Sequence, residues 1–143
     1  MTSPAVEIST FLQTGGIGTL GASSDWGIFT GREPTDPDTA VTVYDTPSAP
    51  SNPKFLLDEP SIQTRIRGAI NGYLGGYDKA QEIKDLLLGI PKQVIGQATY
   101  VGIWQTSDIM FLKFDDNDRP LFTINWRMFR EPFTPSGTNR ESL

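Results

Sequence analysis

The stretch Ser61–Gly89, SIQTRIRGAINGYLGGYDKAQEIKDLLLG, decides the fold because its hydrophobic period changes half-way along. Its first seven residues alternate, which places Ile62, Thr64 and Ile66 on one side of an extended strand and polar residues on the other. After a glycine-rich connection, apolar residues recur every three or four positions, as on one stripe of a helix. The stripe consists of Tyr73, Tyr77, Ala80, Ile83 or Lys84, and Leu87. A helix with one apolar stripe must cover a surface, so we predict that it packs on a sheet containing the strand.

The composition excludes the commonest kinds of catalytic and metal site. A chain of 143 residues suits one domain. It contains neither cysteine nor histidine, so it has no disulfide, no thiolate ligand and no imidazole base or ligand. We therefore predict a protein that is not an enzyme and that has no cofactor, no metal and no catalytic residues.

The net charge of -5 is unevenly distributed along the chain. Residues 1–60 contain eight acids and two bases, whereas residues 61–143 contain nine acids and ten bases. No basic cluster typical of a phosphate-binding surface is visible, and no apolar run approaches the ~18 residues that can span a membrane. We expect neither specific binding to nucleic acid nor insertion into a membrane.

The residues before the central stretch predict one short helix and two strands. Ser3 is a suitable N-cap and is followed by proline, which begins a helix over residues 4–12. Residues 26–30 and 40–44 are predicted strands, separated by a turn-rich loop with three acids. Residues 46–60 contain four prolines and form a long loop, which is either a mobile surface segment or a partner-binding loop.

The residues after the helix predict three more strands. Residues 93–105 form a strand that bends at its glycines, and residues 109–114 and 121–129 flank a polar turn as a hairpin. From residue 131 to residue 143 the pattern is lost, and we predict a disordered tail. Because strands follow one another rather than alternate with helices, residues 1–130 are predicted to form one α+β domain. Its sheet is mixed and mainly antiparallel, with two helices packed on one face.

Three short motifs could carry chemistry, and a structural interpretation is favoured for each. Residues 16–21 read G-x-G-x-x-G, but a helix enters the motif and a strand leaves it, the reverse of the order that binds a pyrophosphate. The acidic run at 115–118 lacks the glycine and the glutamate of a calcium loop and is typical of a hairpin turn. The acid pairs at positions 36 and 38 and at positions 58 and 59 have no partner nucleophile, so we interpret them as solvated loop carboxylates.

Arg65 and Arg67 share one face of the predicted strand. Three interpretations stay open for them. They pair with the acidic loops of their own chain, they pair with acids of a neighbouring subunit, or they form an ordinary solvated face.

In this order, the predicted elements resemble the tail terminator proteins of long-tailed phages with non-contractile tails, the lambda-like group, which are also classed as minor tail or minor capsid proteins. The similarity rests on the order and spacing of segments over about residues 5–130 rather than on one motif. The segments are the short N-terminal helix, Trp26–Thr30, a turn with Glu33–Pro34 and Pro37–Asp38, Ala40–Tyr44, Pro60–Gly68, Tyr77–Gly89, Phe114–Arg119 and Phe122–Trp126. The loop at 46–60 departs from the shorter connections of that family.

This resemblance implies a structural virion protein, located at the head-proximal end of the tail and assembled in the host cytoplasm. It implies a homo-oligomeric ring, expected to be a hexamer, that caps the tail tube and stops the polymerisation of the tail tube protein. The ring would offer a docking face to a head-completion or connector protein, and DNA would pass through it without specific binding. As contacts to another subunit or to the tube we single out Arg65, Arg67 and Arg127, and as lumen-facing residues Asp36, Asp38 and Asp45. The lumen candidates follow from the acidic first half of the chain, since acids repel phosphates and let DNA slide.

Two other functions stay open. One is a head-completion or connector protein of the same virion. The other is a small ligand-binding domain or enzyme that uses the glycine motif or the carboxylates. A hexamer in solution or on tail tubes favours the terminator, whereas a strict monomer that binds nucleotide favours the ligand-binding domain.

Overall fold

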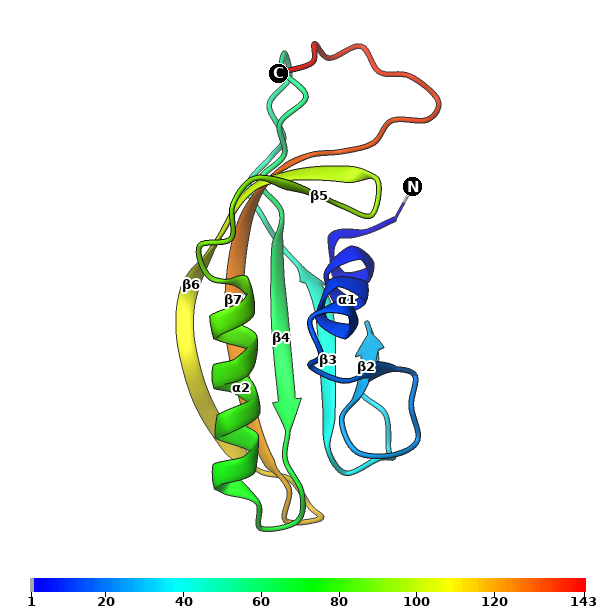
Figure 1. Ribbon diagram of the computed structural model, residues 1–143. Coiled ribbons are helices and arrows are strands. Elements are labelled where there is room, and N and C mark those ends of the chain that lie inside the picture. Colours follow the sequence, from blue (N-terminus) through cyan, green and yellow to red (C-terminus); the bar gives the residue numbers. More distant parts are fainter. Residues whose placement is uncertain (1) are drawn as a thin grey trace.

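The computed structural model describes residues 2–143 and contains two helices packed on a seven-stranded sheet (Figure 1). The helices are α1 (Pro4–Thr14) and α2 (Tyr73–Leu87). The strands are β1 (Thr19–Leu20), β2 (Gly27–Thr30), β3 (Ala40–Thr46), β4 (Ser61–Arg67), β5 (Gln93–Ile95), β6 (Ala98–Phe114) and β7 (Pro120–Glu131). The predicted α+β class, with both helices on one face, is confirmed.

The sheet is mixed, as predicted, with the strand order β1-β2-β3-β4-β7-β6-β5. The pairs β1/β2 and β2/β3 are parallel, and the other four pairs are antiparallel. The parallel pair β2/β3 is joined by residues 31–39, which we call the acidic loop. Neither helix of the described residues, 2–143, has the length and apolar character needed to cross a membrane.

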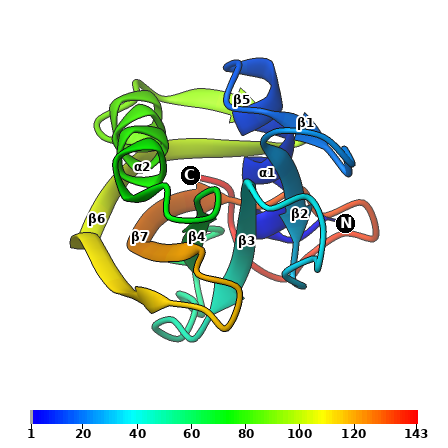
Figure 2. The ribbon, with the colours of Figure 1, turned by 90° about the horizontal axis from the view of Figure 1, so that it is seen from below.

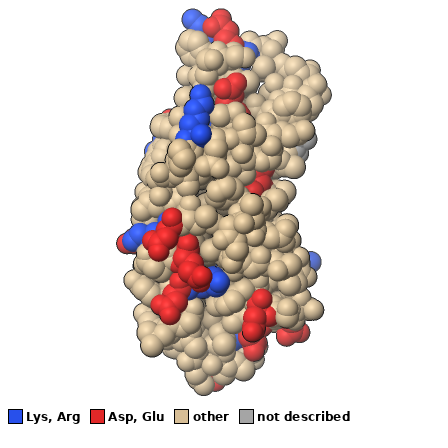
Figure 3. Space-filling view, viewed as in Figure 1, with Lys and Arg blue, Asp and Glu red and all other residues tan. Residues whose placement is uncertain are grey.

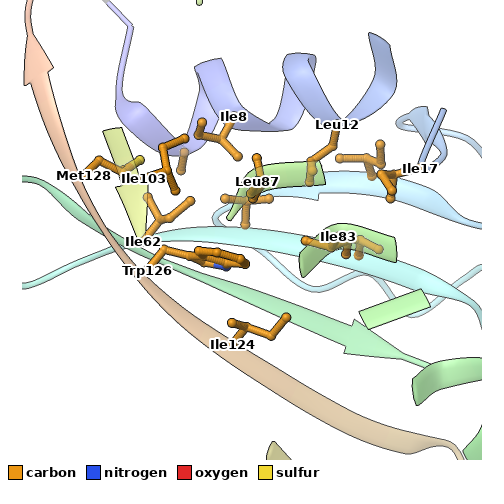
Figure 4. Close-up of a cluster of buried hydrophobic side chains, with 14 of the residues drawn as sticks. Ile8, Leu12, Ile17, Ile62, Ile83, Leu87, Ile103, Ile124, Trp126 and Met128 are labelled. Atoms are coloured by element: carbon orange, nitrogen blue, oxygen red, sulfur yellow. The ribbon is translucent and has the colours of Figure 1, made fainter. Parts of the chain in front are cut away.

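The core lies between the helices and one face of β4 and β7 (Figure 4). The predicted inward residues of β4, Ile62, Thr64 and Ile66, are all fully buried. The inward residues of β7 are also fully buried, and they are Phe122, Ile124, Trp126 and Met128. Both strands were readable from sequence because strict alternation marks a strand that has one buried face.

Helix α1 begins as predicted. The Ser3 hydroxyl accepts a hydrogen bond from the backbone N–H of Val6 (3.3 Å), and a proline occupies the first helical position. A second acceptor comes from β3, because the backbone N–H of Ala5 donates to the Asp45 carboxylate at 2.9 Å. A negative charge at a helix N-terminus is stabilising, so β3 fixes the position of α1 as well as packing against it.

The buried stripe of α2 differs from the predicted one at its start. Tyr73 and Tyr77 are each 40 % exposed and contact Phe122, with ring centroids 5.1 and 6.2 Å apart. The buried residues of α2 are Gly76, Lys79, Ala80, Ile83 and Leu87. At Gly76 a Cβ atom would lie 2.8 Å from the Phe122 ring, so the absence of a side chain lets the helix approach the sheet.

Strand β6 is one continuous strand of 17 residues where the sequence predicted two separate strands. Its register with the 12-residue β7 shifts at four places, and at each place β6 contains one extra residue. Every extra residue reverses the side to which the following side chains point, so no simple alternation is visible in the sequence. Such bulges also bend and twist a strand, and seen along its length the sheet curls around the two helices (Figure 2).

The glycine motif at 16–21 is a connector, as predicted, and it contains the short edge strand β1, which the sequence analysis did not detect. A helix enters it and a strand leaves it. Ile17 in this connector is buried, and its backbone carbonyl accepts a hydrogen bond from Lys79 on α2 at 3.0 Å.

The C-terminal segment, for which we predicted a disordered tail, makes specific contacts in the structure. Glu141 pairs with the long loop at 46–60 through two backbone hydrogen bonds, to Lys54 (2.7 Å) and to Leu56 (2.6 Å). Arg140 forms an ion pair with Asp58 at 2.8 Å. Two segments without sheet structure of their own therefore support each other at one end of the molecule (Figure 1).

Candidate functional site: two buried arginines and the acidic loop

Arg67 is a buried side chain at the end of β4 that holds the acidic loop. Its guanidinium donates to the backbone carbonyls of Pro34 (2.7 Å), Pro37 (2.6 Å) and Asp38 (2.9 Å), and to the Glu33 carboxylate (3.1 Å). Its planar fork of donors suits this set of acceptors, which a lysine could not match. Only 4 % of the side chain is exposed, so Arg67 follows the first of the three interpretations and pairs within its own chain.

Arg119 holds the acidic loop from the turn between β6 and β7. It donates to the carbonyl of Thr35 (2.9 Å) and to the carboxylates of Asp38 (3.1 Å) and Asp115 (2.8 Å). Asp115 also accepts from the backbone N–H groups of Asn117 and Arg119, both at 2.9 Å. The Asp115 carboxylate therefore accepts hydrogen bonds from within the turn, as is typical of a hairpin. Residues 2–143 contain no cluster of acids arranged to hold a metal ion.

Burial, neighbouring charges and hydrogen bonds shift the pKa values of Arg67 and Asp115 in this network. Burial lowers the pKa of Arg67 below its ordinary value, and the positive charge of Arg119 lowers it further. Burial works to raise the pKa of Asp115, but hydrogen bonds from Arg119 and Asn117 outweigh it, so this pKa lies below 3.8. The carboxylate of Asp115 therefore stays ionised as the partner of Arg119.

The other two arginines singled out from the sequence lie on the opposite face of the sheet from the helices and pair within the chain. Arg65 forms an ion pair with Glu33 at 3.0 Å. Arg127 pairs with Glu59 and lies over the ring of Trp104, 5.9 Å from its centroid. Their side chains are 29 % and 40 % exposed, so a contact to another subunit or to the tube stays a prediction for these two.

The three predicted lumen residues do not form one group. Asp36 is exposed in the acidic loop, and Asp38 lies near it, 47 % exposed and paired with Arg119. Asp45 lies near the other end of β3, where it is exposed and bound to the N-terminus of α1. The structure therefore brings Asp36 and Asp38 together and separates Asp45 from them, and their place in a lumen stays a prediction.

A buried polar cluster, which the sequence analysis did not detect, joins α1 to the end of the sheet. Glu7 accepts hydrogen bonds from the hydroxyl of Tyr100 (2.7 Å) and from Arg130 (3.0 Å), whose guanidinium also reaches the carbonyl of Thr2. Burial and the carboxylate of Glu7 raise the pKa of Tyr100. From the sequence alone, the spacing of Ser3 and Glu7 predicts a loose capping pattern at the start of α1 rather than a buried cluster. The only available signal was its position in line with apolar residues of α1, because its partners are about a hundred residues away.

The acid pair at positions 58 and 59 is not arranged for general acid–base catalysis. Asp58 pairs with Arg140 and Glu59 pairs with Arg127, so the two carboxylates face different cations. A pocket of about 270 Å³ is lined by Leu56, Gln97, Thr99, Glu131, Pro132, Phe133, Thr134 and Ser142, and neither member of the acid pair is among them. Glu131 is the one titratable side chain in that lining, and an acid–base pair needs two.

The sequence matches a known protein family over most of its length. A family model described as "Bacteriophage tail terminator protein" matches residues 11–131. The chain belongs to the bacteriophage tail terminator family. The match begins inside α1 and ends on the last residue of β7, so it includes the whole sheet, the acidic loop and the two arginines that hold this loop. The resemblance drawn from the sequence is thereby confirmed, and the chain is a structural virion protein of a phage tail, a class that is not enzymatic.

One solved structure supports the fold of this tail terminator family member. A chain from "Virion of native gene transfer agent (GTA) particle" superposes with a TM-score of 0.60 at 15 % sequence identity, covering 73 % of this chain and 78 % of that chain. At this identity the likeness shows the fold alone. No curated protein matches the sequence.

Proposed function

We propose that this chain forms a closed ring, with six copies, that caps the finished tail tube at its head-proximal end. The ring stops further polymerisation of the tail tube protein and presents a docking face to a head-completion or connector protein. The observation that carries this proposal is the family match, which extends over nearly the entire α+β domain. The chain acts by shape and self-association, and it assembles onto the tail in the host cytoplasm.

The fold is consistent with a subunit that has two distinct ends. One end carries the acidic loop, the start of α2 and the turn between β6 and β7, and the other carries the long loop at 46–60 and the C-terminal segment (Figure 1). A closed ring on a tube needs one end for the tube and one for the head, and its heterologous contacts need two different lateral faces.

The proposal is tested by electron microscopy of tails assembled without this chain. Loss of a terminator gives tubes of uncontrolled length, and addition of the purified protein restores a uniform length. Labelled protein should lie at the head-proximal tip of head-free tails. Tails of normal length without the chain, or label found only on heads, would show a connector protein instead.

We further propose that Asp36 and Asp38 face the lumen and keep DNA mobile by repelling its phosphates. Support comes from their exposure on a loop that two buried arginines hold in place. Asp36 is the cleaner test residue because Asp38 and Asp45 also stabilise the fold.

The lumen proposal is tested by reversing one exposed charge. Asp36→Lys should slow DNA ejection, whereas Asp85→Lys, at an exposed position near the end of α2, makes the same charge change elsewhere and should leave it unaltered. Equal ejection kinetics for Asp36→Lys and the unmodified protein would remove Asp36 from the lumen.

A further inference from the structure

An exposed aromatic patch lies where α2 begins beside the end of β6. It consists of Tyr73, Leu74, Tyr77, Phe111 and Phe114. Three of its rings form one chain of contacts, since Tyr73 and Phe114 both lie within 5.5 Å of Phe111, centroid to centroid, and Tyr77 joins them through the buried ring of Phe122. Leu74 is 74 % exposed and the four rings are 38–43 % exposed. Four rings of roughly 150–250 Å² each, exposed to that extent, leave on the order of 300 Å² of mostly apolar surface, the lower end of the size of the largest apolar patch on a typical monomer, which is often functional.

The surroundings of the aromatic patch carry few charges. Residues 68–77 contain no charged side chain, and residues 109–114 contain one, Lys113. In the space-filling view, the surface directly below the charged side chains at the left is uncharged, whereas acids lie further to the right at the same end of the molecule (Figure 3). A partner of the patch therefore has to be uncharged as well, because burying an unpaired charge against it would be costly.

The neighbouring edge of the sheet is open. Strand β5 pairs only with Ala98–Tyr100, and within residues 2–143 no strand pairs with β6 from Trp104 to Phe114 on that side. Proteins usually shorten, charge or cover such a long open edge. Here the bulges of β6 and the charged residues Asp108 and Lys113 protect the edge only in part, so this side of the subunit is suited to being covered in an assembly.

The opposite edge of the sheet has small, uncharged side chains. Residues 15–24, GGIGTLGASS, include β1 and contain four glycines and no charge, with Asp25 directly after them. Leu20 is the exposed apolar residue of this edge, at 39 %. The outward N–H of Leu20 is already bonded to the Gln13 side chain at 2.8 Å, so a partner would meet this edge through side chains rather than by adding a strand.

We infer that neighbouring copies of this chain meet through these two edges, with the aromatic patch of one copy against residues 15–24 of the next. This rests on the proposed ring and names its lateral contact. The strand order places β1 and β6 towards opposite edges of the sheet, and Figure 2 shows β1 and α2 on opposite sides of the molecule. A protruding aromatic surface on one side and an uncharged, glycine-rich surface on the other form the two different faces that a heterologous contact requires.

The test uses two exposed leucines, Leu74 in the aromatic patch and Leu20 on the opposite edge. Leu74→Glu and Leu20→Lys each place a charge in the contact, so each variant alone should assemble at least about tenfold more weakly, as measured by light scattering and by occupancy of tail-tube ends. An equal mixture of the two variants should recover assembly. In a mixed ring one contact is unmodified, and in the other the introduced acid faces the introduced base.

Leu88→Glu is the matched control, because Leu88 is 42 % exposed at the other end of α2, and it should assemble like the unmodified chain. Circular dichroism of each variant verifies the fold.

Normal assembly of Leu74→Glu or Leu20→Lys would overturn the inference. Failure of the mixture to recover assembly would also overturn it, since that result marks contact between identical patches. Rings that form from Leu74→Glu but no longer bind tubes would assign the patch to the tube. Absence of any ring from the unmodified chain, with or without tubes, would instead contradict the proposed function itself.

Discussion

Arg67 and Arg65 are two residues apart on β4, yet the structure uses them differently. Arg67 is buried under the acidic loop and donates to four of its backbone carbonyls, whereas Arg65 is only partly buried and forms one ion pair. Buried carbonyls that lose their donors cannot turn to water, while an exposed ion pair contributes little. The same residue type therefore has a structural role at one position and a minor one at the other.

This contrast gives a matched pair of substitutions. Arg67→Met should lower the free energy of unfolding by about 3 kcal/mol or more, because it leaves the buried carbonyl acceptors of the acidic loop without their donor. Arg65→Met should cost at most about 1 kcal/mol. Urea unfolding measures both, and limited proteolysis should cut the acidic loop only in the Arg67 variant. Similar losses for the two variants would show that the acidic loop does not depend on Arg67.

The depressed pKa of Asp115 predicts a loss of stability in acid. A carboxylate whose pKa is lower in the folded state than its ordinary value of 3.8 stabilises the fold above that value, and this contribution is lost as the pH falls through the folded pKa. Unfolding followed between pH 5 and pH 2 should show this decline. Asp115→Asn should be less stable near neutral pH and should show a shallower decline in acid. An unchanged acid profile in that variant would assign the decline to other carboxylates.

At the scale of elements, two adjacent glycines in the first turns of α2 have opposite surroundings. A Cβ at Gly76 would lie 2.8 Å from the ring of Phe122, which is fully buried and has no space to move. A Cβ at Gly75 would meet nothing within 4 Å. Helix propensity favours alanine at both positions, so packing alone separates them.

Alanine at each position should therefore change stability in opposite directions. Gly75→Ala should stabilise the protein by about 0.5–1 kcal/mol through helix propensity. Gly76→Ala should destabilise it by about 1–2 kcal/mol, because overpacking against Phe122 exceeds the propensity gain. Thermal unfolding compares the two variants. A stabilising Gly76→Ala would mean that α2 can move away from the sheet at little cost.

How far the sequence predicted each element depended on how regular its surroundings are. Strands β4 and β7 have one continuously buried face, so their alternation was visible in residues such as Ile62 and Trp126. Strand β6 was divided in two because its four extra residues reverse the alternation, and β1 is only two residues long. The start of α2 was misjudged because the residue at its closest approach to the sheet is Gly76, which carries no hydrophobic signal.

The candidate site was less predictable than the fold. The sequence marked Arg65 and Arg67 as a pair, but only the folded chain brings the carbonyls of the acidic loop to one of them. The cluster of Glu7, Tyr100 and Arg130 joins residues far apart in the chain, and no local pattern encodes such a contact. Short-range periodicity predicts which face of an element is buried, whereas these contacts depend on the order of the strands.

On the scale of the whole molecule, the subunit has charged and uncharged regions in different places. Both edges of the curled sheet carry uncharged surface, and the acidic loop lies at one end, held by Arg67 and Arg119. Lateral contacts in a ring can then be apolar, while the acidic loop stays in solvent. This arrangement suits a subunit whose edges meet its neighbours and whose ends meet the tube and the head.

The central claim is that copies of this chain close into a ring at the end of a tail tube. Electron microscopy of head-free tails, with the purified chain of 15.8 kDa added to tubes made without it, measures this directly. We expect one closed ring of six subunits at a single end of each tube, and no further growth of that end when tail tube protein is supplied. Single subunits scattered along the tubes, or tube ends that continue to grow with the chain present, would contradict it.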